Sequence, residues 1–406
     1  MLPDFSPPFF VNKYIGGIPH DWSWKDLSKI STPKQWATIS QSEMTEVGFP
    51  VYGANGKIGY FHTYNHTDSV IAISCRGACG DVHLTEPKSY VTGNAMCLDG
   101  VTKDIDQDFL YFALIYRTVE DAISGSAQPQ ITRESLKGVL FPSPPLPEQK
   151  KIAAILTSVD EVIDATQKQI DKLQDLKKAT MNELLTKGIG HTEFKDSELG
   201  MIPKSWEVRA LGEILDLKNG VNTDKDAFGS GSPFITYMDV HSGNDLDETV
   251  LRKFVKLSAK ENEAFSVKFG DVFFTRTSET PEEIGLSNTY LGRDVGAVFN
   301  GFCIRGRPKS KLLSAKLSKY LFRSEYIRTQ MKLLCKYTTR AGISGESLNR
   351  CLIALPPMNE QFISENTIIS FDKDLRLKEI KLAQTQSLKK SLMQDLLTGK
   401  VRVKVD

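Results

Sequence analysis

The longest hydrophobic pattern in the chain lies between Pro147 and Thr186. Apolar residues recur there at alternating steps of three and four, which is the spacing of a coiled-coil seam. The seam consists of Ile152, Leu156, Val159, Ile163, Ile170 and Leu173, interrupted only by Thr166. Pro147 and Glu148 suit the first turn of a helix. At about 1.5 Å per residue, the segment predicts a helix about 55–60 Å long.

A second segment of the same kind covers residues 359–398. Its seam contains Ile368, Phe371, Leu375 and Leu382, followed by Leu392 and Leu396. Gly399 stands where a helix should end. Each seam is a narrow apolar stripe that one small domain would not cover, so we expect the two helices to pack antiparallel against each other, with a globular module at the start of each. The alternative is two unrelated amphipathic helices, each docked on its own domain.

The segments that precede these helices mix strand and helix patterns. Asn55-Gly56 is a two-residue turn signal between alternating flanks, and it predicts a hairpin. The other expected elements are a buried strand at 70–74, a short helix at 109–118, a strand at 271–276 and a helix at 317–334. Both interiors are therefore predicted to be mixed α/β domains.

Three short segments occur twice in the same order. The pairs are GGIPHDW at 16–22 with GMIPKSW at 200–206, ITRESL and PPLPEQ within 131–149 with ISGESL and PPMNEQ within 343–361, and LKKATMNELLT at 176–186 with LKKSLMQDLLT at 388–398. The first pair is offset by 184 residues and the others by 212, so the second copy holds an insertion of 28 residues. The chain is a tandem duplication, which predicts a pseudo-symmetric molecule.

What differs between the copies is also informative. The interiors share little sequence, although the segments around them are repeated closely. This contrast indicates a constant scaffold around variable recognition surfaces, and ordinary drift after duplication is the alternative. We interpret the Pro and Trp of GxIPxxW as a buried anchor that packs each module onto the helix pair, and the PPLPEQ segment as a hinge and helix start.

Composition limits the class of protein. A chain of 406 residues has room for two domains, and 40% hydrophobic residues is normal for a globular protein. No apolar run is long enough to span a bilayer, and the first residues lack the features of a signal peptide, so a cytoplasmic protein is expected. The six cysteines contain no CxxC pair, which argues against a disulfide framework or a zinc site.

Charge distinguishes the two interiors. Residues 31–145 hold 8 Lys and Arg against 12 Asp and Glu, a balance of −4, whereas residues 207–356 hold 22 against 18, a balance of +4. A basic stretch contributes Arg305, Arg307, Lys309, Lys311, Lys316, Lys319, Arg323, Arg328, Lys332, Lys336 and Arg340. Because DNA binding requires neutralisation of phosphates, the first module would need a partner that supplies positive charge.

No pattern for catalysis is found in the sequence. There is no Walker lysine, no metal-ligand spacing and no Gly-x-Ser-x-Gly turn. His62 and His66 lie four residues apart, but no cysteine or carboxylate is paired with them in the sequence. The glycines at 53, 56 and 59 fit a hairpin and not a phosphate loop. We therefore predict no catalytic residue, no metal and no cofactor on this chain.

The loops that follow the predicted strands are the candidate DNA contacts. Arg76 and Arg276 each lie among small polar residues directly after an apolar strand. Arginine can read a guanine edge, and Ser and Thr can bind phosphate. A surface ion pair is an equally open explanation for either arginine. The full candidate set is Lys57, Arg76, Gln128, Gln130, Arg276, Thr277 and Arg340.

Taken together, the repeated motifs and the segment GSAQPQI at 125–131 resemble the specificity subunits of type I restriction–modification systems. The resemblance covers nearly the whole chain. It implies two target-recognition domains that each read half of a bipartite sequence in double-stranded DNA. It also implies two methyltransferase subunits, which bind S-adenosylmethionine and methylate adenine, and motor-nuclease subunits where cleavage follows. The specificity subunit itself is expected to bind no cofactor.

The expected fold is thus α+β: two mixed α/β target-recognition domains joined by two long antiparallel coiled-coil helices, with pseudo-two-fold symmetry. The predicted segments are residues 1–146 and 189–357 for the domains, and 147–188 and 358–400 for the spacer helices. Asn359 replaces Pro147 in the second copy, and its loop 338–340 lacks glutamine, so base contacts cannot be transferred between the halves. The alternatives are a two-headed coiled-coil scaffold that binds only proteins, and a self-sufficient DNA-modifying enzyme.

Overall fold

The computed structural model describes residues 14, 17–125, 128–337 and 339–405. Ser126, Ala127 and Thr338 of the predicted loops lie outside this part. The chain forms two compact units: residues 1–169 with 378–406, and residues 170–377. Each unit contains one module together with part of both long helices. Among the described residues, no helix combines the length and the apolar character needed to cross a bilayer.

The first module contains small sheets and one prominent helix. A four-stranded sheet has the order β2-β8-β5-β6, a three-stranded sheet has the order β4-β3-β7, and β1 pairs with β9. The strands are β1 (Ser23–Asp26), β2 (Thr32–Lys34), β3 (Phe49–Gly53), β4 (Gly56–Phe61), β5 (Ile71–Ser74), β6 (Val82–Leu84), β7 (Tyr90–Val91), β8 (Ala95–Asp99) and β9 (Leu140–Ser143). The helices before the long one are α2 (Leu27–Ile30) and α3 (Gln107–Arg117).

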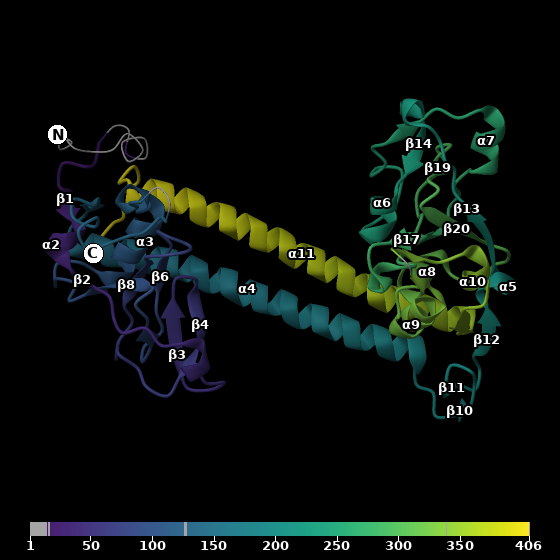
Figure 1. The fold of residues 1–406 in the computed structure, drawn as a ribbon, viewed down its shortest axis with the longest axis horizontal. Helices are drawn as coiled ribbons and strands as arrows, with labels where there is room; N and C mark the ends of the chain where they lie inside the picture. Colours follow the sequence, from purple (N-terminus) through teal and green to yellow (C-terminus); the bar gives the residue numbers. More distant parts are fainter. Residues whose placement is uncertain (1–13, 15–16, 126–127, 338, 406) are drawn as a thin grey trace. The chain divides into compact units, whose positions relative to one another are not determined.

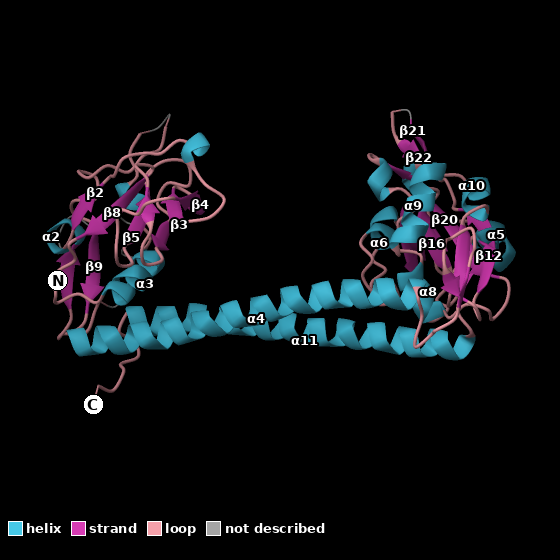
Figure 2. Ribbon diagram, turned by 90° about the horizontal axis from the view of Figure 1, so that it is seen from below, coloured by secondary structure: helices cyan, strands magenta, loops and turns pink. Residues whose placement is uncertain are grey.

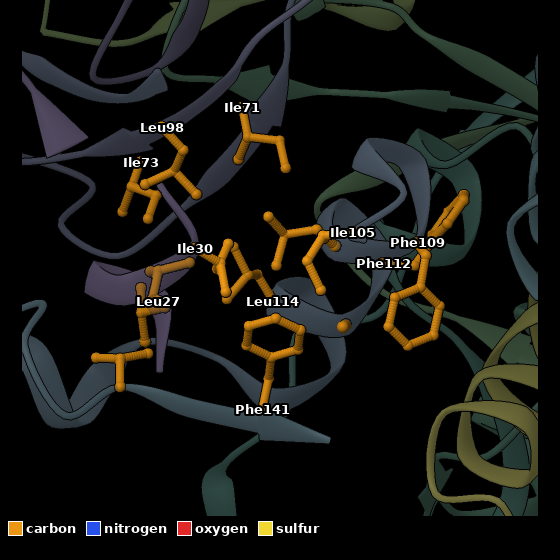
Figure 3. Close-up of a cluster of buried hydrophobic side chains, with 14 of the residues drawn as sticks. Leu27, Ile30, Ile71, Ile73, Leu98, Ile105, Phe109, Phe112, Leu114 and Phe141 are labelled. Atoms are coloured by element: carbon orange, nitrogen blue, oxygen red, sulfur yellow. The ribbon is translucent and has the colours of Figure 1, made fainter. Parts of the chain in front are cut away.

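The core of this module lies between the four-stranded sheet, α3 and β9. Ile71 and Ile73 of β5 are completely buried, as are Phe109 of α3 and Phe141 of β9. Figure 3 shows these side chains gathered with Leu27 of α2 in one cluster. Burying each such side chain contributes about 1.5–3 kcal/mol to stability. The module therefore has a substantial core of its own.

The second module repeats this plan with more elements. Its strands are β10 (Phe194–Lys195), β11 (Ile202–Pro203), β12 (Glu207–Ala210), β13 (Leu215–Asn219), β14 (Phe228–Ile235), β15 (Phe254–Val255), β16 (Val272–Thr275), β17 (Thr277–Ser278), β18 (Ser287–Thr289), β19 (Val298–Phe299), β20 (Cys303–Pro308), β21 (Lys336–Tyr337), β22 (Ala341–Gly342) and β23 (Leu352–Leu355). Its short helices are α5 (Leu211–Ile214), α6 (Tyr237–His241), α7 (Ala259–Ala264), α8 (Ala315–Leu321), α9 (Glu325–Leu334) and α10 (Gly345–Asn349).

The two modules share one topology despite their different interior sequences. The sheet order β13-β20-β16-β18 matches β2-β8-β5-β6, and the pair β12-β23 matches β1-β9. The three-stranded sheets also correspond: β3 pairs in parallel with β7, as β14 does with β19. The duplication therefore extends through the interiors and is not confined to the repeated motifs.

The two long helices form as predicted. α4 spans Leu146–Thr186 and α11 spans Met358–Leu397. Thr166, the one polar residue in the first seam, is buried, and its hydroxyl donates to the carbonyl of Val162 at 2.7 Å, which satisfies it within the helix. Gly188 and Gly399 follow the helix ends with φ of +69° each, a conformation that favours glycine.

Within each unit α4 and α11 pack antiparallel, as both views show (Figure 1, Figure 2). Lys389 pairs with Asp160 at 2.7 Å in the first unit, and Lys177 pairs with Asp372 in the second. Lys177 and Lys389 are related by the repeat offset of 212, and so are Asp160 and Asp372. The same ion pair thus occurs once in each unit, and the predicted antiparallel packing of the two helices is confirmed.

Two local predictions need correction. The hairpin of β3 and β4 is present, but Gly53 pairs with Gly56, so the turn residues are Ala54 and Asn55. Gly56 has φ of +76° and begins the second strand, where an irregular register absorbs one extra residue. The predicted helix at 317–334 is divided into α8 and α9, because the backbone of Ser324 is extended and starts a new helix.

A buried Glu-Gln pair, Glu148-Gln149 in α4 and Glu360-Gln361 in α11, joins each module to the start of a long helix. The glutamine makes the following contacts. Gln149 accepts from the amide of Asp106 at 2.8 Å, and Asp106 is the N-cap of α3. Gln361 accepts from the amide of Ser314 at 2.9 Å, and Ser314 is the N-cap of α8. Both glutamines also donate to backbone carbonyls nearby. This glutamine therefore links the start of the long helix to the start of a module helix.

The adjacent glutamate binds the tryptophan of the GxIPxxW motif. Trp22 donates its indole N–H to Glu148 at 3.2 Å, and Arg402 contacts the same carboxylate at 2.8 Å. Glu148 is almost fully buried, so its charge requires these partners. Through this contact the GxIPxxW segment is attached to the start of α4, as an anchor would be.

The second unit repeats the anchor with one substitution. Trp206 donates to Glu360 at 3.0 Å, and His191 lies 2.9 Å from the same carboxylate. His191 and Arg402 both stand three residues after the glycine that ends a long helix. In both units, therefore, a basic residue that follows the end of a long helix contacts the buried carboxylate.

The glutamine link predicts a stability effect. Gln361→Ala removes three hydrogen bonds, including those donated to the carbonyls of Leu312 and Pro356 at 2.8 Å each. Because buried polar groups lose their partners, we expect a loss of about 2–4 kcal/mol. This corresponds to a melting temperature of the second unit lower by roughly 5–15 °C, measured by scanning calorimetry. Asn366→Ala, at an exposed position on the same helix, is the matched control; equal shifts in both variants would contradict the assignment.

Candidate nucleic-acid interface

In the first module, Arg76 lies where three segments meet. It is exposed and lies two residues after the end of β5. The hydroxyl of Ser74 donates to the carbonyl of Ala54 in the hairpin turn, and the amide of Ile131 donates to the carbonyl of Cys75 at 3.1 Å. The backbone around Arg76 is thus fixed between the hairpin and the loop that ends at Ile131. An exposed arginine on a fixed backbone suits base or phosphate contact.

The glutamines of the first module occupy that neighbouring loop. Ser124 and Gln130 exchange two backbone hydrogen bonds, at 2.9 and 2.8 Å, which close the loop as a small hairpin. Gln128 and Gln130 are both exposed. The bond from Ile131 to Cys75 therefore places the loop of Gln128 and Gln130 beside the strand end that is followed by Arg76.

Lys57 is differently placed. It lies on β4, and its ammonium pairs with Glu86 at 2.9 Å; this hydrogen bond raises the pKa of Lys57. Both side chains are substantially exposed, so the pair is weak. The ammonium of Lys57 is thus already paired within the protein, and it would have to leave Glu86 to contact a DNA phosphate.

In the second module, Arg276 and Thr277 follow β16. The amide of Ile343 donates to the carbonyl of Arg276 at 3.0 Å, just as Ile131 donates to Cys75. Arg276 is therefore the counterpart of Cys75, and Thr277 is the counterpart of Arg76. The Arg276 guanidinium is partly buried and reaches the carbonyl of Gly301 at 3.4 Å. The two strand-end arginines thus occupy different positions in the shared fold.

Arg340 lies in the hairpin of β21 and β22. Lys336 pairs with Gly342 there, as Ser124 pairs with Gln130 in the first module, which makes Arg340 the counterpart of Gln128. β22 also pairs with β17, and Arg340 is exposed and lies 3.2 Å from Glu279. Arg276, Thr277 and Arg340 are therefore brought together by one small sheet, β17-β22-β21.

The basic stretch of the second module is largely used inside the fold. Arg305 donates to the carbonyl of Ser266 at 2.7 Å, and Arg307 forms a two-pronged pair with Asp271 at 2.7 and 2.8 Å. The guanidiniums of Arg323 and Arg328 donate to backbone carbonyls at the ends of short elements. These four arginines therefore have structural roles in the fold.

Burial explains the electrostatics of these arginines. Burial lowers the pKa of Arg305 and of Arg323, and it lowers the pKa of Arg328 to about 10. The hydrogen bond to Asp271 has the opposite effect on Arg307 and raises its pKa. A guanidinium that is bonded to carbonyls and withdrawn from water is a poor contact for DNA.

A surface feature that the sequence did not reveal lies in the second unit. A groove of about 870 Å³ runs between the end of α4 and the start of α9. Lys177, Lys178 and Lys332 line it, together with Arg323 and Arg328. Lys178 and Lys332 are exposed and available to an anionic partner. The residues come from separate elements, so no local pattern in the sequence connects them.

The predicted helix-packing residues are all withdrawn from solvent at least in part. The buried members are Ile152, Leu156, Ile170, Ile368 and Leu375. The partly buried members are Val159, Ile163, Leu173, Phe371 and Leu382. Burial is greatest where a module packs onto the helices, because Ile152 and Leu156 join the core of the first module and Ile368 joins that of the second.

One group of residues in the described part of the chain has the composition of a metal site. His66, Cys97 and Asp99 offer ligand atoms that all lie within 4.8 Å of one another. They belong to the first module and lie near β8, away from the α3 side of its sheet. The sequence alone associates His66 only with His62, because Cys97 and Asp99 are about thirty residues away along the chain.

Comparison with known proteins gives a consistent result over both halves. Residues 19–175 and 203–385 each match the family model described as the type I restriction modification DNA specificity domain. The chain is 28% identical over 433 residues to the putative type I restriction enzyme MjaX specificity subunit of Methanocaldococcus jannaschii, with 97% of each chain covered. It is also 28% identical over 354 residues to the MjaVIII specificity subunit of that organism, covering 80% of this chain and 77% of that protein.

A solved structure shows the same fold. The type I restriction-modification S subunit from M. genitalium superposes with a TM-score of 0.62 over 93% of this chain and 96% of that one, at 15% sequence identity. At this identity the likeness concerns the fold alone.

The structural role of the buried arginines predicts a stability effect in place of a DNA-binding effect. Arg328 donates to the carbonyls of Ile284 and Glu282, so Arg328→Met leaves two acceptors unpaired. We expect the free energy of unfolding to fall by about 2–4 kcal/mol, measured by urea denaturation. Lys332→Met removes an exposed charge from the same helix and should change stability by less than about 0.5 kcal/mol. Normal stability with weakened DNA binding in Arg328→Met would contradict the structural role.

Proposed function

The chain belongs to the family of type I restriction–modification DNA specificity subunits, and from this membership we propose that each of its two target-recognition domains reads one half of a bipartite DNA sequence. The observation that supports this is that the two domains share one topology but carry different side chains at equivalent positions. Arg76 is replaced by Thr277 at the strand end, and Gln128 is replaced by Arg340 in the following hairpin. Two equivalent sites with different side chains would read different bases.

We further propose that the chemistry resides on partner subunits. Two methyltransferase subunits with S-adenosylmethionine would methylate adenine in each half-site, and motor-nuclease subunits would cleave unmodified DNA. The negative balance of the first interior supports this division, since a domain with 8 basic and 12 acidic residues attracts DNA weakly. The structural use of the arginines in the second module lowers its available positive charge as well. A basic partner would complete the DNA-binding surface.

The long helices would set the gap between the half-sites. α4 has 41 residues and α11 has 40. Their seams keep a seven-residue repeat, so their register is defined along the whole length. A helix rises about 1.5 Å per residue, and B-form DNA rises about 3.4 Å per base pair. A change in helix length would therefore change the number of base pairs between the half-sites.

Mapping of methylated adenines tests the proposed function. The chain is co-expressed with its neighbouring methyltransferase in a host without adenine methylation, and modified positions are read across the host DNA. We expect one bipartite motif with a fixed gap, which disappears when this chain is omitted. Methylation that persists without the chain would instead support a scaffold that binds only proteins.

Single substitutions in the same assay separate the two domains. Arg76→Ala should relax the sequence at one half-site, by about 1–3 kcal/mol of discrimination if Arg76 reads a base. Arg340→Ala should affect only the other half-site, so each variant is the control for the other. If both variants altered the same half-site, the assignment of one domain to each would be wrong.

The proposal that helix length sets the gap between the half-sites is tested by lengthening both helices together. Lys378 donates to Gln169 at 2.7 Å, so these residues lie at the same level of the helix pair. Seven residues inserted after Gln169 and after Leu377 keep the heptad register. The insertion adds about 10 Å of helix, which should widen the gap by up to about three base pairs and leave both half-sites unchanged. An insertion of three residues in both helices breaks the register and serves as the control. An altered half-site with an unchanged gap would contradict the proposal that helix length sets the gap.

A further inference from the structure

Three different metal-ligating groups meet in the first module. Cys97 and Asp99 lie two residues apart on β8, so both side chains project from the same face of the sheet. His66 comes from the segment between β4 and β5, and its Nε2 lies 3.0 Å from Oδ1 of Asp99. The ligand atoms of all three residues lie within 4.8 Å of one another. Nitrogen, sulfur and oxygen ligands in such proximity match the donor set of zinc.

The hydrogen bonds around His66 determine which ring nitrogen holds a proton. The Asn65 amide is oriented by Val91: its Oδ1 accepts from the Val91 N–H at 2.9 Å, and its Nδ2 donates to the Val91 carbonyl at 2.9 Å. Nδ1 of His66 lies 2.7 Å from that same Oδ1. Because Oδ1 can only accept, Nδ1 must be the donor. A neutral His66 therefore presents the lone pair of Nε2 towards Asp99.

This arrangement places two acceptors against each other. Nε2 of neutral His66 and Oδ1 of Asp99 both carry lone pairs, and 3.0 Å between them is unfavourable unless a positive charge lies between. Either a second proton or a metal cation would supply it. We propose that His66, Cys97 and Asp99 bind a zinc ion, with solvent as the fourth ligand. A simple ion pair of protonated His66 with Asp99 is the competing explanation, and it gives Cys97 no part.

The surroundings hold the ligands in place. The indole N–H of Trp36 donates to Oδ2 of Asp99 at 3.2 Å, and the Trp36 ring meets the His66 ring edge-on at 5.2 Å between centroids. The backbone of His66 exchanges two hydrogen bonds with Ser89 at 3.1 Å. Metal sites depend on such outer contacts, which orient the histidine and the carboxylate.

Binding must displace the proton of Cys97. The thiol is completely buried, and burial raises its pKa, so the side chain is protonated in the absence of metal. The zinc–sulfur bond forms as the S–H bond breaks, and the proton leaves to solvent. A second proton leaves from Nε2 if His66 is protonated beforehand.

The expected role of the ion is structural. It would tie the segment around His66 to β8, and through Trp36 to the segment that follows β2. These segments belong to the first module alone. Ligand binding stabilises the folded state by mass action, so metal should raise the melting temperature of the first unit and leave that of the second unchanged. This expectation does not depend on the proposed function in DNA recognition.

Cobalt provides a spectroscopic test with the full-length chain. The purified protein is treated with a chelator, exchanged into metal-free buffer and titrated with Co²⁺, which adopts zinc sites and shows a thiolate-to-cobalt charge-transfer absorption. We expect saturation at one ion per chain and displacement by Zn²⁺. Cys97→Ala should abolish the absorption, whereas Cys75→Ala, at another buried cysteine of the same module, should retain it. Absence of saturable binding by the folded protein, or an unchanged absorption in Cys97→Ala, would overturn the proposal.

A second variant distinguishes loss of the metal site from misfolding of the protein. Asn65→Ala removes the amide that orients His66 but keeps all three ligands, and it should weaken metal affinity about 10–100-fold. Circular dichroism without metal establishes whether each variant is folded. If Cys97→Ala is unfolded, His66→Gln replaces it, with loss of the zinc-induced rise in melting temperature as the readout. An equal rise in His66→Gln and in the unmodified protein would refute the site.

Discussion

The buried glutamate at the start of each long helix is the contact on which the arrangement of each unit depends. Glu148 and Glu360 are withdrawn from water, so each negative charge must be met by donors of the protein. An indole N–H from the module provides one donor, and Arg402 or His191 from beyond a helix end provides another. One carboxylate therefore holds together a module, the beginning of one helix and the segment that follows the other helix.

The repeat preserves this contact more closely than it preserves the module interiors. A strand pairing needs only alternating apolar residues of suitable volume, and many sequences meet that condition. The buried Glu-Gln pair needs particular acceptors and donors at fixed distances, so few substitutions are tolerated. This difference accounts for two domains with one topology, nearly identical attachment motifs and dissimilar interiors. The exposed loops can then vary without disturbing either the sheets or the attachment to the helices.

The long helices could be predicted from the sequence because their pattern is local and repeated many times. The loops proposed to contact DNA could be located in the sequence because each follows a strong strand pattern. The structural role of Arg328 could not be predicted, since its carbonyl partners lie more than forty residues away. The approach of His66 to Cys97 depends in the same way on how strands pair. The division of the helix at Ser324 was also hidden, because serine is tolerated within a helix and starts one only in a suitable tertiary setting.

The first unit is assembled from two separate stretches of the chain, residues 1–169 and 378–406. Met393, Leu396 and Leu397 belong to the core of the first module, and Arg402 completes its anchor. The second unit consists of one continuous stretch, residues 170–377. During synthesis on the ribosome, the second unit therefore has all its parts while the first still lacks its last helix and anchor. The domain that is translated first is therefore completed after the second, and until residues 378–406 are made its helix-facing apolar surface is covered by α4 alone.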